Sequence, residues 1–404
     1  MKIAAVAILS IPALVAVIHN AGPNAEKRDL APLPERPANW ASALEMPAKL
    51  NAWVNDHFGY RKEMVEFNNQ LRFKLFREFP SIQMVSGRHG RYFLAAHAIG
   101  TLPFQAIGNV CGRMSPPSPG TVEYFNRLFA DFHRMGLQPK MLIVPSAPVL
   151  YSEDMPAFLV DNCASMETPS NVVLNAPDLS QEARDAIFFP LREMRQIKNR
   201  ATLFPRSWFH WSGAGLDDVA QLSLSHFWGL SAIPAPPLKT MAHMEPSDVA
   251  HLFPGIDLRS EIVEPDLAAS GIEGCYGARC FPEFGDFGET LYDISRFKNP
   301  KAPARRLVIL SDSFGSKITP WYARYYREVE HVATNNMAKL GTQQIKILKD
   351  VLFRDPGNID LMFLYHDGGA VQNTLRFGIE RLHEPASLAQ AAGKAGKAGN
   401  EGSR

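Results

Sequence analysis

The sequence has almost no net charge. Its 404 residues include 42 lysines and arginines against 41 aspartates and glutamates, a formal net charge of +1. Proteins that bind nucleic acids usually present a strongly basic surface, so the charge balance gives no support for a nucleic-acid partner and we predict none. Hydrophobic residues make up 46% of the chain, which is typical of a folded globular protein.

Cysteine is scarce as well. The chain has four cysteines, which form no Cys-x-x-Cys pair and have no nearby histidine ligands, and this disfavours the alternative of a zinc site. An even number of cysteines in an exported protein indicates disulfides. Cys275 and Cys280 bracket a turn-forming stretch, so we predict the pairs Cys275–Cys280 and Cys111–Cys163.

Long apolar runs are absent except at the N-terminus. Residues 361–365 are too short to span a membrane, whereas Met1-Lys2 precedes the run Ile3–Ile18, which only Ser10 and Pro12 interrupt. A basic start followed at once by an apolar run is a targeting pattern rather than a buried core helix. Because His19-Asn20 occupies the place of a cleavage site, we predict that residues 1–20 form a retained membrane anchor; a cleaved signal peptide is the alternative.

The rest of the chain divides by composition. Residues 21–40 are polar and rich in proline, which predicts an extended tether. Residues 41–385 are predicted to form one folded domain. Residues 386–404 are rich in alanine, glycine and lysine without an apolar pattern, which predicts a disordered tail. We therefore expect a domain in the periplasm, tethered to the inner membrane.

Helical and strand patterns alternate within the predicted domain, which is typical of an α/β fold with a mostly parallel central sheet. Predicted helices cover 44–79 (with a break near Gly59), 122–135, 180–198 and the stretch from 316 to about 329. Predicted strands cover 82–85, 92–94, 141–144, 307–310 and 359–365.

The turn Ser311–Gly315 is the first candidate for chemistry. It follows the apolar strand 307–310 and precedes a helical stretch, so Ser313 is expected at the edge of the sheet where α/β folds bind ligands. The N–H groups of the following helix can stabilise an oxyanion, with Asp312 and Gly315 supporting the turn. That arrangement suits a nucleophilic serine, and an ordinary Asp/Ser helix cap is the alternative.

A nucleophilic serine needs a base, and His210 is the best candidate. It lies between aromatic residues just before the glycine-rich segment 213–215. The alternative is a histidine packed for structural reasons.

Several segments together resemble the alginate O-acetyltransferase family of the AlgX and AlgJ type, over residues 26 to about 380. The N-terminal matches are Glu26–Pro34, Asp56–Arg61 (DHFGYR) with Asn68-Asn69 and Leu71-Arg72, and Gly87–Phe93 (GRHGRYF). The later matches are Met141–Pro145, Tyr151–Pro156, His210–Ser212 with Gly213-Ala214, and Ser311–Gly315 (SDSFG). Each motif is moderately specific, and their shared order is much more specific.

The resemblance implies an SGNH-hydrolase-like domain of three layers, α/β/α. It implies acyl transfer with Ser313 as the nucleophile and His210 as the base, and no metal or cofactor. The acetyl group would pass from a donor to a hydroxyl of an exported polysaccharide. A membrane-embedded acetyl donor protein and other polysaccharide secretion proteins are the partners that the resemblance implies.

Three positions depart from the family pattern. The family's catalytic acid lies two residues before the histidine, where this chain has Trp208, which cannot accept the imidazole N–H or stabilise an imidazolium. In serine proteases the loss of the acid's role costs about 10⁴ in kcat. Ser311 replaces a glycine, and Arg91 replaces a tryptophan; these two changes bear on turn geometry and packing.

Another carboxylate would have to replace the acid. Asp217 and Asp218 lie about two helical turns beyond His210, too far to reach back. Asp367 follows the predicted strand 359–365 at the correct edge of the sheet, so it is the substitute we name, while its neighbour His366 is expected to be an unrelated loop histidine. Because the acid position is Trp208, a non-catalytic scaffold that binds polysaccharide or assembly partners stays open, as does an acetyl esterase.

Overall fold

The computed structural model describes residues 30–57, 60–98, 100–112, 114–230, 238–372 and 376–383. The predicted anchor (1–20), the first part of the predicted tether (21–29) and the predicted tail (386–404) lie outside these residues. Within the described ranges, no helix combines the length and the apolar character needed to cross a membrane. The residues predicted as one domain, 41–385, are divided between two compact units: one contains the chain up to Ser81 together with Pro246–Arg259, and the other contains the rest.

Among the described residues, the first unit contains the helices α2 (Trp40–His57), α3 (Arg61–Phe76) and α12 (Asp248–Leu252). The break near residue 59 is confirmed, since α2 ends at His57 and α3 begins at Arg61. A small aromatic core joins the sequence-distant parts: the ring of Phe79 lies 5.3 Å from Phe73 and 5.7 Å from Phe253. The amide of Asn69 donates to the carbonyl of Pro254 at 2.9 Å.

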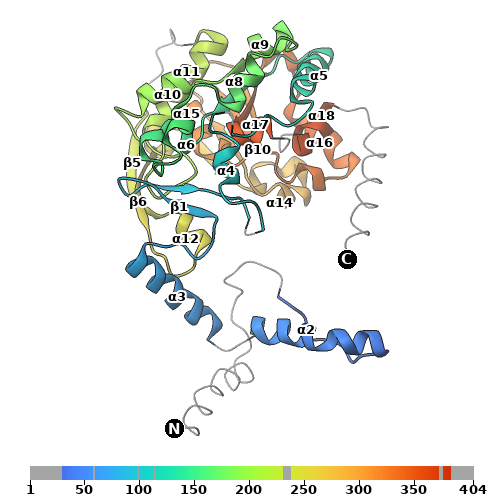
Figure 1. Ribbon diagram of the computed structural model, residues 1–404. Coiled ribbons are helices and arrows are strands. Elements are labelled where there is room, and N and C mark those ends of the chain that lie inside the picture. The colour runs from blue at the N-terminus through green and yellow to red at the C-terminus, as the bar shows by residue number, and fades with distance from the viewer. Residues whose placement is uncertain are drawn as a thin grey trace. The chain divides into compact units, whose positions relative to one another are not determined.

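The second unit is organised around a mixed sheet of seven strands (Figure 1). Its order is β4 (Ile187–Phe188), β3 (Lys140–Val144), β11 (Ile359–His366), β9 (Arg306–Ser311), β10 (Glu328–Ala333), β8 (Ile294–Lys298) and β7 (Glu273–Tyr276). The first five strands are parallel and the last two are antiparallel to their neighbours. The mixed α/β fold with a mostly parallel central sheet is therefore confirmed.

Successive side chains of a strand point to opposite faces of the sheet. Both sets are buried here, because helices cover both faces. In β9, Leu307 and Ile309 enter one core cluster, while Val308 and Leu310 enter the other. The helices that contribute to the first cluster include α6 (Ala147–Leu150), α7 (Val160–Ala164), α10 (Leu191–Ile197), α11 (Gly215–Trp228) and α15 (Gly315–Tyr322). Those that contribute to the second are α5 (Thr121–Arg134), α8 (Pro169–Leu174), α9 (Gln181–Ala186), α14 (Phe287–Leu291), α16 (Thr342–Leu352), α17 (Asp367–Val371) and α18 (Arg376–His383).

Smaller elements lie around this sandwich. They are the hairpin β1 (Met84–Ser86) and β2 (Tyr92–Leu94), the helices α4 (Gln105–Gly108) and α13 (Leu267–Ser270), and the paired strands β5 (Thr240–Pro246) and β6 (Arg259–Pro265). The hairpin confirms the two strands predicted around the turn 87–90.

The helix predicted over 180–198 is wrong as a single element. The segment forms α9, then the short edge strand β4, then α10. Pro190 lacks an N–H, and it disfavours helical geometry at the residue before it. The β-branched and aromatic pair Ile187-Phe188 extends the sheet instead, beside Met141 and Leu142 of β3.

The helical stretch predicted from 316 to about 329 is also wrong in its second half. Helix α15 ends at Tyr322, and strand β10 begins at Glu328. The sequence pattern does not predict this strand, because its centre carries two polar residues, Glu330 and His331. Both are fully buried in the structure. Each has partners that a linear pattern does not reveal.

Both predicted disulfides are present, Cys111–Cys163 and Cys275–Cys280. None of the four cysteines is left free. The zinc alternative is therefore wrong, because no thiolate is left to bind a metal ion.

Glu330 is the centre of a buried ion-pair cluster within the sheet. Its carboxylate accepts hydrogen bonds from Arg296 at 2.8 and 3.0 Å, from Arg306 at 2.9 Å and from Arg354 at 3.1 Å. The Glu330 side chain has no exposed surface. Desolvation makes such a cluster costly to form, but the loss of its only fully buried anion would leave several guanidinium groups without their shared partner.

We predict that Glu330→Ala lowers the free energy of unfolding by about 3–5 kcal/mol, the usual cost of removing one partner of a buried ion pair. Urea denaturation of the full chain measures the change. Asp350→Ala is the matched control: Asp350 pairs with Lys346 on an exposed face of α16, and its removal is expected to cost no more than about 0.5 kcal/mol. Equal effects of the two substitutions would contradict this account of the cluster.

Candidate active site

A cavity of about 520 Å³ lies at the carboxyl edge of the parallel strands. Residues that follow β3, β9, β10 and β11 line it, and this is the edge where open α/β sheets bind ligands. The lining includes Ser146, Asp312, Ser313, Phe314, Thr334, Asn335, Tyr365 and His366 from the strand ends, and Leu94, His97, Gln105, Asn109, Phe209, His210 and Gln372 from surrounding segments.

Ser313 and His210 meet on the wall of this cavity. Nε2 of His210 lies 3.0 Å from Oγ of Ser313, although the two residues are 103 positions apart in the sequence. Ser313 stands in the turn between β9 and α15, and His210 stands in the loop before α11. The structure thus brings together the two residues that the sequence indicated as nucleophile and base.

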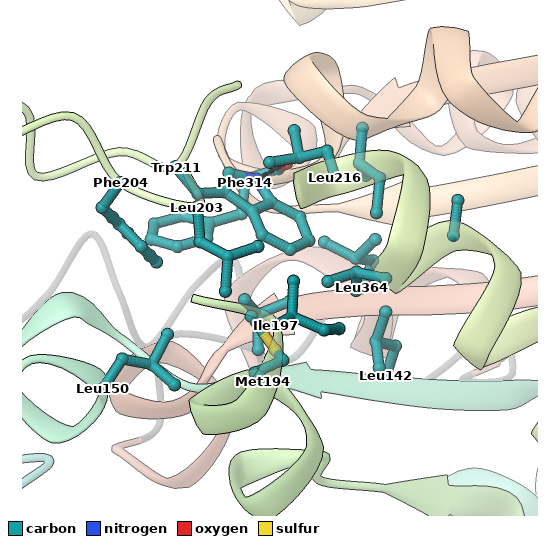
Figure 2. Packing of buried hydrophobic residues seen from close by; sticks show 14 of the residues in the cluster. Leu142, Leu150, Met194, Ile197, Leu203, Phe204, Trp211, Leu216, Phe314 and Leu364 are labelled. Atoms are coloured by element: carbon teal, nitrogen blue, oxygen red, sulfur yellow. Dashed lines mark hydrogen bonds between the residues drawn. The ribbon is translucent and has the colours of Figure 1, made fainter. Parts of the chain in front are cut away.

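An aromatic contact fixes the histidine loop to the serine turn. The buried indole of Trp211 donates from Nε1 to the carbonyl oxygen of Phe314 at 2.6 Å. The ring of Phe314 also contacts His210, with 5.6 Å between centroids, and Phe204, with 6.1 Å. Figure 2 shows the rings of Phe204, Trp211 and Phe314 gathered beside Leu203. This packing positions His210 through its neighbour Trp211 and through its own contact with Phe314.

The carboxylate of Asp312 binds two strand ends together. One oxygen accepts the N–H of Phe314 at 2.9 Å, as expected for a residue that supports the turn. The other accepts the backbone N–H of His366 at 2.9 Å and lies 2.5 Å from Nδ1 of the same histidine. The N–H of Gly315 donates to the carbonyl of Asp312 at 3.2 Å. The N–H groups of Phe314 and Gly315 are therefore engaged inside the turn.

Ser311 explains why Gly315 is required. The Ser311 hydroxyl, fully buried, lies 2.7 Å from Nε2 of His331 in β10. A Cβ on residue 315 would lie 2.0 Å from that hydroxyl and 2.7 Å from the same imidazole nitrogen. The serine that replaces the family's glycine thus occupies the space beside the turn.

The expectation that His366 is an unrelated loop histidine is wrong. It ends β11, lines the cavity, and stacks on Phe314 with 5.2 Å between centroids. Burial opposes its protonation, but the nearby Asp312 carboxylate outweighs burial and holds the pKa of the imidazole above its usual value. The sequence carried a weak signal, since His366 directly follows a strongly apolar strand.

Asp367 lies on the other side of the same strand end. Its carboxylate accepts hydrogen bonds from the hydroxyl and the N–H of Ser146, and from the N–H of Gly368 at 2.9 Å. Burial raises the pKa of Asp367, and the hydrogen bonds from Ser146 act in the opposite direction. The structure therefore brings Asp367 to Ser146. It shows Asp217 and Asp218 paired with Arg324 and Arg200.

Trp208 fills the position where the family has its acid. The ring is buried, and the ammonium of Lys317 lies over it at 5.6 Å from the centroid. Its Nε1 has no hydrogen-bond partner among the described residues. Position 208 thus supplies an aromatic surface, and no carboxylate, next to the histidine loop.

Arg91, the third departure, forms a buried contact of its own. Its guanidinium stacks on Tyr151 at 3.6 Å from the ring centroid and donates to Asp154 at 2.9 Å. It also donates to the carbonyl of Phe204 at 3.0 Å, and Phe204 packs on Phe314. The arginine therefore supports the aromatic cluster behind the site.

Sequence reasoning missed the carboxamides of the cavity. Asn109 and Asn335 line it, together with Gln105 and Gln372. Asn335 follows β10, the strand that the sequence analysis did not recognise, so its position at the sheet edge was hidden. The other three residues lie in loops and short helices whose placement depends on tertiary contacts.

No family model matches the sequence, and no curated protein matches it either. Solved structures with a similar fold include a DHHW family protein from Eubacterium siraeum (14% identity, 75% of this chain and 99% of that chain, TM-score 0.48). They also include the O-acetyltransferase domain of Pseudomonas putida AlgJ (14%, 76% and 99%, 0.38) and Pseudomonas aeruginosa AlgX (10%, 72% and 66%, 0.42). Two of the similar structures thus carry the names of the family that the motifs resemble.

We predict that Gly315→Ala destabilises the chain by about 1–3 kcal/mol, the usual cost of overpacking a filled site. Ser311→Gly in the same chain should recover part of this loss, because it removes the nearest clashing atom. Thermal unfolding of the two single variants and the double variant measures the coupling. Gly357→Ala is the control, since no atom lies within 4 Å of a Cβ built there. If the losses of stability caused by Gly315→Ala and Ser311→Gly simply add in the double variant, the predicted clash is contradicted.

His366 also predicts a pH-dependent contribution to stability. Because its pKa is higher in the folded than in the unfolded protein, the contribution is complete below the unfolded value of about 6.5. It is lost as the pH rises through the folded value. The difference in Tm between the natural chain and His366→Asn should therefore be largest below about pH 6.5 and shrink as the pH rises above that value. A difference independent of pH would rule out a charged His366–Asp312 pair.

Proposed function

We propose that this chain is an SGNH-hydrolase-like O-acetyltransferase that acetylates hydroxyls of an exported, alginate-like polysaccharide. The observation that carries the proposal is the 3.0 Å contact between Ser313 Oγ and His210 Nε2 on the wall of a cavity at the carboxyl edge of the sheet. A base within hydrogen-bond reach of a hydroxyl is the arrangement needed for a serine nucleophile. The acetyl group and the polysaccharide come from the resemblance of the sequence motifs.

The proposed reaction has two half-reactions. His210 takes the proton of Ser313 as Oγ bonds to the acetyl carbon of the donor, and the donor group leaves with a proton. An acceptor hydroxyl then bonds to the acetyl carbon and loses its proton, which balances the proton that the donor group carried away. Oγ leaves and recovers its own proton from His210. In both steps the oxyanion needs donors other than the engaged N–H groups of Phe314 and Gly315. The side-chain amides of Asn109 and Asn335 are the cavity groups that we assign to it.

Export is part of the proposal. Two disulfides suit an oxidising compartment such as the periplasm. The N-terminal run Ile3–Ile18 would tether the domain to the inner membrane, beside a membrane-embedded acetyl donor protein and other proteins of polysaccharide secretion.

The second candidate function is a scaffold that binds polysaccharide without chemistry, and Trp208 is the observation that favours it. A site without the acid's contribution is expected to lose about 10⁴ in kcat relative to a complete triad. An acetyl esterase is the third candidate, because water can replace the acceptor hydroxyl in the second half-reaction. Supplying an acceptor glycan separates the two enzymes, since only transfer yields an acetylated sugar.

We predict that a strain producing Ser313→Ala at the normal level loses acetylation of its exported polysaccharide. Acetyl content of the purified polymer measures the effect. The Ser316→Ala strain is the control, because the Ser316 hydroxyl donates to the backbone carbonyl of Ser313 at the start of α15. Unchanged acetylation in the Ser313→Ala strain would exclude the proposed reaction and favour the scaffold.

A further inference from the structure

His366 and Asp312 form a His–carboxylate pair on the same cavity as Ser313 and His210. Nδ1 of His366 lies 2.5 Å from the Asp312 carboxylate. The cavity-lining imidazole is 25% exposed, and its Nε2 has no hydrogen-bond partner among the described residues. A carboxylate at Nδ1 with Nε2 facing a cavity is the arrangement by which an aspartate orients a catalytic histidine.

The register of the sheet places this pair beside the nucleophile. Leu364 of β11 lies opposite Ser311 of β9, and the two strands are parallel. His366 and Ser313 each stand two residues further on, and neighbouring strands lie about 4.8 Å apart. Both residues therefore leave the sheet at the same level of its carboxyl edge. The ring of Phe314 contacts both His210 and His366.

The imidazole of His366 packs closely against the backbone of Gly368 and Gly369. A Cβ on residue 369 would lie 2.8 Å from the His366 ring and 3.1 Å from the Asp312 carboxylate, and one on residue 368 would lie 3.2 Å from Nε2. Gly369 is thus needed for the pair to fit, and Gly368 avoids a tight contact with Nε2. The charged and titratable groups that act on the ring are Asp312, Asp367 and His97.

We propose that the His366–Asp312 pair is a second proton-transfer group, which serves the leaving group of the donor and the hydroxyl of the acceptor while His210 serves Ser313. This inference rests on the proposed acyl transfer and assigns it a further catalytic residue. The site would then contain a histidine that is oriented by a carboxylate, although Trp208 stands where the resembled family has its catalytic acid.

The proton balance closes over the two half-reactions. In the first, His210 takes the Ser313 proton, and the imidazolium of His366 gives its Nε2 proton to the departing donor atom as the bond to the acetyl carbon breaks. In the second, the acceptor hydroxyl bonds to the acetyl carbon and gives its proton to the neutral His366. Oγ of Ser313 then leaves and takes its proton back from His210. Both histidines end in their starting states.

The test compares acylation with transfer in the full-length protein. With p-nitrophenyl acetate the leaving nitrophenolate needs no proton, so the burst of nitrophenolate reports acylation of Ser313 without His366. His366 then gives its proton to the solvent before it accepts the proton of the acceptor. Methanol is then the acceptor, and methyl acetate is measured. His366→Asn keeps an amide donor toward Asp312 but removes the proton-transfer group. We expect an unchanged burst rate and transfer slowed by about 10²–10⁴-fold.

The matched control is His226→Asn. His226 stacks on Phe188 and does not belong to the cavity lining, so both rates should stay unchanged. A second variant, His366→Ala, should regain transfer when imidazole is added, which a purely structural role would not permit.

The outcomes separate the two proposals. A natural chain without a burst would overturn acyl transfer and this inference with it. A normal burst with normal transfer in His366→Asn would overturn this inference alone. Loss of the burst in His366→Asn would also overturn it. So would a failure of imidazole to restore transfer in His366→Ala. An intact burst with slow transfer and imidazole rescue would support the role of His366.

Discussion

The carboxylate of Asp312 is the contact on which the geometry of the site depends. It accepts the N–H of Phe314, which shapes the turn after β9, and both the N–H and the imidazole of His366, which ends β11. One side chain thereby fixes two adjacent strand ends. This fixes the turn that holds Ser313. Phe314 of the same turn contacts the ring of His210 and accepts a hydrogen bond from the indole of Trp211, so the histidine is held beside the serine.

Buried polar contacts also stabilise the sheet that bears the site. Ser311 contacts His331, and Glu330 binds Arg296 of β8, Arg306 of β9 and Arg354, which lies between α16 and β11. Burial lowers the pKa of His331, because a charged imidazole there would lose its hydration. The strands that bear the site are thus specified by paired polar groups as well as by the apolar layers above and below.

The sequence predicted the parts of the fold that simple periodicity encodes. Strands 141–144, 307–310 and 359–365 are continuous apolar runs, and all three were found, as were the helix over 122–135 and both disulfides. Strand β10 was missed because Glu330 and His331 look exposed until their partners are known. The pair Ser313–His210 was predictable from motifs, whereas His366–Asp312 was not, since it depends on the register between β9 and β11 and on room left by Gly368 and Gly369.

The central claim is that Ser313 carries the acyl group between donor and acceptor. Peptide mapping by mass spectrometry, after the full-length protein has been mixed with p-nitrophenyl acetate and quenched in acid, tests it most directly. The account predicts one acetyl group on the peptide that contains Ser313, which disappears when an acceptor alcohol is added before the quench. Acetylation confined to other residues, or no acetylated peptide at all, would contradict it.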